Sequence, residues 1–82
     1  MKLFVKNIEH SVNEAQLEFV FAQHGEVVNT KIIYDRITWE SRGFGIVEMK
    51  NKEGALKAIE NVNGKELKGK ALMVEEYVEK RK

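Results

Sequence analysis

Apolar and polar residues alternate along short segments of this chain, as they do in strands that bury one face. Residues 2–6 read Lys-Leu-Phe-Val-Lys, which places Leu3 and Val5 on one side and Phe4 on the other. Residues 27–34 are rich in β-branched side chains, and residues 42–49 and 71–75 continue the alternation. The pattern predicts four strands over these ranges.

Helical spacing separates the strands at two places. The first helix is expected after Asn13, a preferred N-cap, with Gln16 as its capping-box partner and Gly25 closing its last turn. The second is expected after Asn51, which can cap it. Their apolar stripes consist of Leu17, Val20 and Phe21 in the first helix and of Ala55, Ala58, Ile59 and Val62 in the second.

The resulting order is strand, helix, strand, strand, helix, strand. It predicts an α+β fold, a ferredoxin-like βαββαβ sandwich in which two helices cover one face of a four-stranded antiparallel sheet. We call the uncovered face of this sheet the open face. The 82 residues suit one domain, expected over 1–78, followed by a short charged C-terminal tail over 79–82.

Composition argues against several classes of site. Cysteine is absent, and His10 and His24 lack the spacing of metal ligands, so we expect neither a metal nor a cofactor. The chain has no Ser/His/Asp set, and Glu75 and Glu76 are adjacent on a strand and point to opposite faces. We therefore expect a protein that is not an enzyme.

Charge and hydropathy set a second group of expectations. The net charge is only +1, so a basic surface requires that charges be segregated. No apolar run is long enough for a transmembrane helix, and the default expectation is a soluble, cytoplasmic protein without a membrane partner.

The phase that buries the aliphatic residues determines what reaches the open face. The open face is expected to carry four basic and two acidic residues, together with two phenylalanines. Exposed phenylalanines on a sheet need a reason, and base stacking, worth about 1–3 kcal/mol per base, is one. The expected residues are Lys2, Phe4, Lys6, Lys31, Ile33, Arg42, Phe44, Ile46, Glu48, Ala71, Met73 and Glu75.

The sequences of two of the predicted strands resemble motifs of a known family. Residues 42–49, Arg-Gly-Phe-Gly-Ile-Val-Glu-Met, resemble the octamer of the RNA recognition motif family, and residues 3–8, Leu-Phe-Val-Lys-Asn-Ile, resemble its hexamer. Both motifs fall on the expected strands, and the resemblance extends from Lys2 to about Tyr77. It departs at Ile46 and Met49, where the octamer has aromatic residues.

The resemblance implies single-stranded RNA binding on the open face, with Phe4 and Phe44 stacking on bases and Arg42 pairing with a phosphate. Ile46 replaces a third ring and would pack against a sugar or base edge. Tyr77 would either stack on a base or cover the core edge. Trp39 stands where the family often has glycine, and would clamp a base, fold back on the sheet edge or contact a second molecule. The expected RNA-binding residues are Lys2, Phe4, Lys6, Lys31, Trp39, Arg42, Phe44, Ile46, Met73, Glu75 and Tyr77.

Two alternatives use the same face. Single-stranded DNA would stack equally well, because stacking does not distinguish the sugars. The apolar Ile33, Ile46 and Met73 would also suit a protein partner or a second copy. Our interpretation is a monomer, with the option of weak self-association, that binds RNA with low to moderate sequence specificity. It would act as a small chaperone or regulator, like the short bacterial and organellar members of the family.

Overall fold

The computed structural model describes residues 1–78, and the expected tail over 79–82 lies outside them. The helices and strands are β1 (Lys2–Lys6), α1 (Glu14–Ala22), β2 (Val27–Tyr34), β3 (Ser41–Met49), α2 (Lys52–Val62), β4 (Glu66–Leu67), β5 (Lys70–Ala71) and β6 (Met73–Glu76). The order confirms the predicted βαββαβ arrangement, with β4 and β5 as an added hairpin.

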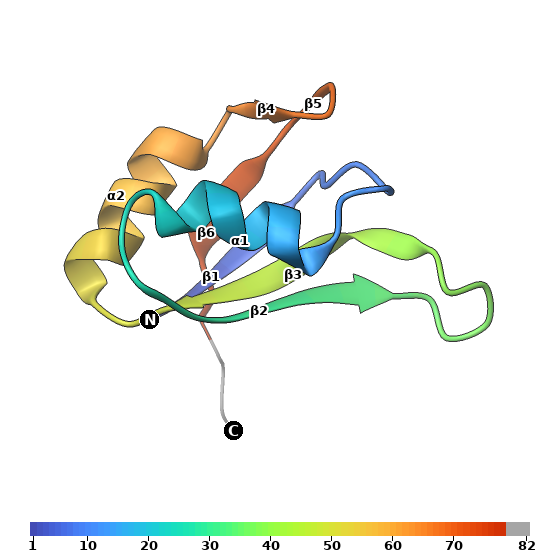
Figure 1. Cartoon of the computed structure of the whole chain (residues 1–82), viewed down its shortest axis with the longest axis horizontal. Coiled ribbons are helices and arrows are strands. Elements are labelled where there is room, and N and C mark those ends of the chain that lie inside the picture. The colour runs from blue at the N-terminus through green and yellow to red at the C-terminus, as the bar shows by residue number, and fades with distance from the viewer. Residues whose placement is uncertain (79–82) are drawn as a thin grey trace.

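Four antiparallel strands form the sheet in the order β2-β3-β1-β6. Both helices pack on the same face of it (Figure 1). The two central strands are β1 and β3, in which Leu3 pairs with Val47 and Phe4 with Ile46. The strands that carry the two motifs are therefore neighbours at the middle of the sheet.

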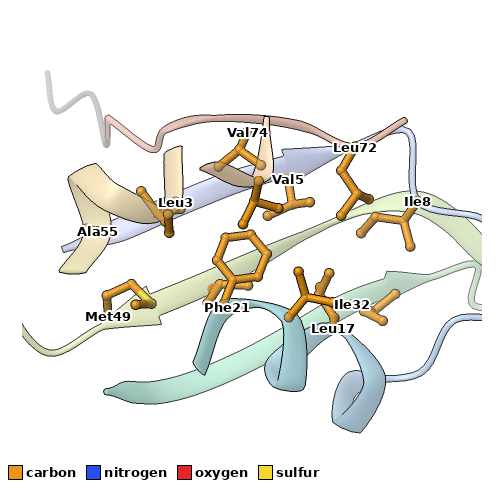
Figure 2. Close-up of a cluster of buried hydrophobic side chains, with 14 of the residues drawn as sticks. Leu3, Val5, Ile8, Leu17, Phe21, Ile32, Met49, Ala55, Leu72 and Val74 are labelled. Atoms are coloured by element: carbon orange, nitrogen blue, oxygen red, sulfur yellow. The ribbon is translucent and has the colours of Figure 1, made fainter. Parts of the chain in front are cut away.

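The hydrophobic core lies between the sheet and the helices (Figure 2). The ring of Phe21 from α1 is fully buried and lies at its centre, between the side chains of the sheet and of α1. Leu3 and Val5 are also fully buried on this side of β1. Because side chains alternate along a strand, their burial directs Phe4 to the open face.

The start of α1 follows the prediction. The Gln16 amide N–H donates to Asn13 Oδ1 at 2.8 Å, and the Asn13 amide N–H donates to Gln16 Oε1 at 3.1 Å. This reciprocal pair is a capping box. Val12 and Leu17, at the two hydrophobic-staple positions, are both buried.

The expected role of Gly25 is wrong. The helix ends at Ala22, and Gln23 caps it in the right-handed helical region. Gly25 instead permits a close approach to α2, since a Cβ added there would lie 2.9 Å from the Cα of Gly54. Asn51 does occupy the N-cap of α2, but its side chain makes no capping hydrogen bond.

The predicted last strand over 71–75 is also displaced. Lys68 and Gly69 both have positive φ angles, 54° and 90°, as in a type I′ turn. This turn pairs Glu66 with Ala71 in a small hairpin, so Ala71 leaves the open face of the main sheet. The last strand of that sheet runs over Met73–Glu76 instead.

Candidate nucleic-acid interface

Three aromatic rings gather on the open face. The centroids of Phe4 and Phe44 are 5.8 Å apart with planes inclined by 65°, and those of Phe4 and Tyr77 are 6.3 Å apart with planes inclined by 56°. All three side chains are half-buried. The Tyr77 amide N–H donates to the Lys2 carbonyl at 2.9 Å, which continues the pairing of β6 with β1. Tyr77 therefore adds a third ring beside Phe4.

Strand register explains how the central residues meet. Ile46 lies opposite Phe4 on one side and opposite Lys31 on the other. Ile46 is half-buried and Lys31 exposed. The neighbouring Gly45 lacks a side chain where β2 comes close, since a Cβ there would lie 2.5 Å from the Lys31 carbonyl oxygen. The glycine therefore allows β2 and β3 to remain paired next to Ile46.

A second glycine shapes the start of β3. Ile32 pairs with Gly45, and Tyr34 pairs with Ser41. One residue of β2 therefore faces three residues of β3 between these two pairs, which makes the ladder irregular. Gly43 absorbs this irregularity with a φ of 84°, in the region that favours glycine. Its carbonyl accepts a hydrogen bond from the Ile8 amide at 2.9 Å. The motif glycines thus have a backbone role.

Charged side chains flank the rings. The Lys6 ammonium lies 2.9 Å from Glu75 Oε2 and 5.8 Å from the centroid of the Phe4 ring. Arg42 Nη1 lies 3.6 Å from Asp35 Oδ2. Lys2 is exposed at the start of β1, two residues before Phe4. Neither ion pair was foreseen from the sequence. The Lys6–Glu75 pair depends on β1 and β6 being neighbours, whereas the Arg42–Asp35 pair joins the two ends of the β2–β3 loop.

Met73 also follows the prediction for the open face. It lies opposite Lys6 across the β1–β6 pair, and its side chain is exposed. Leu72 and Val74, on either side of it, are buried in the core. The face is therefore mixed, with an apolar residue at its β6 edge.

The loop between β2 and β3 is ordered by Asp35 and extends beyond the helices (Figure 1). Asp35 Oδ1 accepts hydrogen bonds from the backbone amides of Thr38 at 3.0 Å and Ile37 at 2.8 Å. These two bonds, first that of Thr38, hold the pKa of the Asp35 carboxyl below its usual value. Trp39 has a φ of 63° and is 79% exposed. Its ring therefore does not fold back on the sheet edge.

Asn7 closes the loop after β1. Its side-chain amide donates to the Ala71 carbonyl at 2.7 Å, and its own φ is 62°. Its amide is therefore engaged with the β4–β5 hairpin.

Residues 1–78 are without two other features, a metal-binding cluster and a membrane-spanning helix. Within that range no three His, Cys, Asp or Glu side chains are grouped so that they could hold a metal ion. Over the same range no helix has the length and apolar character to cross a membrane.

Comparison with known proteins gives concordant results. A family model described as the RNA recognition motif matches residues 3–73. Glycine-rich RNA-binding protein 10 of Brassica napus is 44% identical over 75 residues, which cover 92% of this chain and 44% of that protein. The tau variant of cleavage stimulation factor subunit 2 of Homo sapiens is 41% identical over 73 residues, covering 89% of this chain and 12% of that protein. The chain thus spans less than half the length of either curated relative.

Solved structures agree with the sequence matches. The crystal structure of RNA binding protein PG1 has a TM-score of 0.92 and 38% identity, covering 100% of this chain and 99% of that one. The SXL-lethal protein/RNA complex has a TM-score of 0.85 and 29% identity, covering 90% of this chain and 46% of that one. This chain belongs to the RNA recognition motif family.

Proposed function

We propose that this protein binds single-stranded RNA on the open face of its sheet. The observation that carries the proposal is the contact between Phe4 and Phe44 on the two central strands, on the face opposite α1 and α2. Stacking platforms of this kind hold the flat faces of successive bases. Membership of the family and the RNA-binding relatives support the same conclusion.

The site residues have distinct roles in this proposal. Phe4 and Phe44 stack on bases, and Tyr77 extends the platform. Arg42 pairs with a phosphate, and Ile46 packs against a sugar or a base edge. The remaining contributors are Lys2, Lys6 and Lys31 as a basic rim, Met73 as an apolar contact, Glu75 beside Phe4, and Trp39 as a clamp from the β2–β3 loop.

An NMR titration of the isotope-labelled chain with short random RNA tests the proposal. Chemical-shift changes centred on Phe4, Phe44 and Arg42 are expected. If these residues do not shift while the residues of the two helices do, the open face is not the site. If nothing shifts at near-millimolar RNA, the protein is not an RNA-binding module of this kind.

Single-stranded DNA is the second candidate ligand. It is favoured by the fact that the proposed contacts are made to bases and phosphates, which RNA and DNA share. RNA and DNA oligomers of one base sequence, titrated in parallel, separate the two, because only a contact to the 2′-hydroxyl group distinguishes them.

The protein is proposed to be a binding module rather than an enzyme, and to act as a small chaperone or regulator in the cytoplasm. The proposed domain covers residues 1–78. If the apolar part of the open face bound a protein partner or a second copy instead, the measured mass would depend on protein concentration and would not respond to RNA. We expect a monomer in that measurement.

A further inference from the structure

An acidic side chain stands beside the ring on which a base is proposed to stack. Glu75 on β6 lies directly opposite Phe4 on β1. Its carboxylate repels the phosphates of any nucleic acid on the open face. A carboxylate in this position is consistent with nucleic-acid binding if it faces the N–H groups of a base.

Lys6 holds the carboxylate in place. Its ammonium lies 2.9 Å from Glu75 Oε2, and it also lies 5.8 Å from the centroid of the Phe4 ring. The Lys6 and Glu75 side chains are 41% and 53% exposed, so both remain accessible to a ligand. A donor-only group and an acceptor-only group are thus side by side next to the Phe4 ring, with the ammonium over the ring.

Guanine fits this pair better than the other bases do. Its Watson–Crick edge presents the O6 acceptor followed by two adjacent donors, the N1–H and the N2 amino group. Both oxygens of one carboxylate can accept from those two donors while an ammonium group donates to O6. Uracil would instead turn a carbonyl oxygen toward the carboxylate, and adenine and cytosine have only one donor group on this edge.

We infer that Glu75, together with Lys6, selects guanine for the base that stacks on Phe4. This inference rests on the proposed RNA-binding function of the open face. It turns a sequence-tolerant stacking platform into one with a preference at a single position. Unpaired bases can be read in this way because their Watson–Crick edges are free.

Three oligonucleotides test the inference with the full 82-residue chain. One is an oligouridine with a single central guanosine, the second has inosine in place of that guanosine, and the third contains uridine alone. Inosine keeps O6 and N1–H and lacks the N2 amino group. We expect the guanosine oligomer to bind about fivefold more tightly than the inosine oligomer, at the low end of the range for a bidentate contact because the pair is half-exposed.

Two variants locate the source of that preference. Glu75→Ala should bind all three oligomers with similar affinity, because the acceptor of both N–H groups is gone. Glu76→Ala is the matched control, since Glu76 lies opposite the buried Leu3 in the same ladder and belongs to the other face. It should retain the full preference for guanosine.

The outcomes distinguish the inference from the function on which it rests. If all three oligomers bind the unmodified protein equally, guanine selection is wrong and RNA binding stands. A preference that survives in Glu75→Ala also overturns the inference, because it then arises elsewhere. If none of the oligomers binds, both the inference and the proposed function fail.

Discussion

The Phe44 ring meets the Phe4 ring at an angle of 65°, with the centroids 5.8 Å apart across the central strands β1 and β3. Each ring therefore limits the positions open to the other. Residues in contact show interaction energies of about 0.5–3 kcal/mol when both are changed. The two phenylalanines are expected to act as one platform.

Removal of either ring should weaken RNA binding. Phe4→Ala and Phe44→Ala are each expected to lose about 1–3 kcal/mol of binding free energy, the range measured for stacking on one base. The double variant should lose an amount that differs from the sum, because the rings touch. Fluorescence anisotropy with a labelled RNA oligomer measures these changes.

Phe19→Ala is the control for that series. Phe19 is an exposed phenylalanine on α1, in the helical layer, so its removal changes the surface by the same chemical group. The RNA affinity of Phe19→Ala should equal that of the unmodified protein. Equal affinities for all three single variants would rule out the open face as the stacking platform.

Addition of a ring at Ile46 should have the opposite effect. Ile46 is half-buried between Phe4 and Lys31, where a phenylalanine would add a flat surface for a base. Ile46→Phe should tighten RNA binding by up to about 1 kcal/mol, the low end of the stacking range. Leu56→Phe, on the exposed side of α2, adds a ring elsewhere and should leave affinity unchanged. An unchanged or weaker affinity for Ile46→Phe counts against this part of the face as the site.

Arg42 should contribute to the salt dependence of binding. For a single strand, each phosphate neutralised adds about 0.7 to the slope of log affinity against log salt concentration. Arg42→Gln should therefore lower that slope by about 0.7. Titrations at several salt concentrations measure it, with Lys57→Gln on α2 as the charge-matched control. A slope that falls equally in both variants would indicate a general charge effect and no contact by Arg42.

Gly45 should be sensitive to substitution for a reason unrelated to RNA. A Cβ at this position would lie 2.5 Å from the Lys31 carbonyl oxygen, which belongs to rigid backbone. Gly45→Ala should lower the free energy of unfolding by about 2 kcal/mol or more, because β2 must move away from β3. Urea denaturation measures the loss. Gly64→Ala should lose less, since its φ of 89° is strained for alanine but no atom lies within 4 Å of the added carbon; equal losses would show that contact with Lys31 is unimportant.

Local signals in the sequence were sufficient for most of the fold. The capping box at Asn13 and Gln16 and the alternation in β1 depend on residues close together in the chain, and both are confirmed. Gly25 misled the prediction because a glycine serves helix ends and close packing equally well. Only the proximity of Gly54, distant in sequence, decides between them.

The site, like the fold, has features that follow from local sequence and features that depend on residues distant in the chain. The outward direction of Phe4 and Phe44 follows from the alternation that buries the aliphatic residues of β1 and β3, and could be predicted. The contacts of Lys6 with Glu75 and of Phe4 with Tyr77 join β1 to the end of the chain, and they depend on strand order and register. With the family's strand order assumed, the antiparallel register of β1 and β6 would have been the signal for both.

Trp39 allows binding and stability to be separated in one variant. Its φ of 63° lies in the left-handed region, which costs a residue with a side chain about 1–2 kcal/mol. Trp39→Gly relieves that strain while increasing the freedom of the unfolded chain, so the free energy of unfolding should stay within about 1 kcal/mol of the original. RNA affinity should nevertheless fall by about 1 kcal/mol, because the exposed ring that is proposed to clamp a base is gone. Trp39→Phe keeps a ring and should retain most of the affinity, whereas unchanged binding by Trp39→Gly would exclude the clamp.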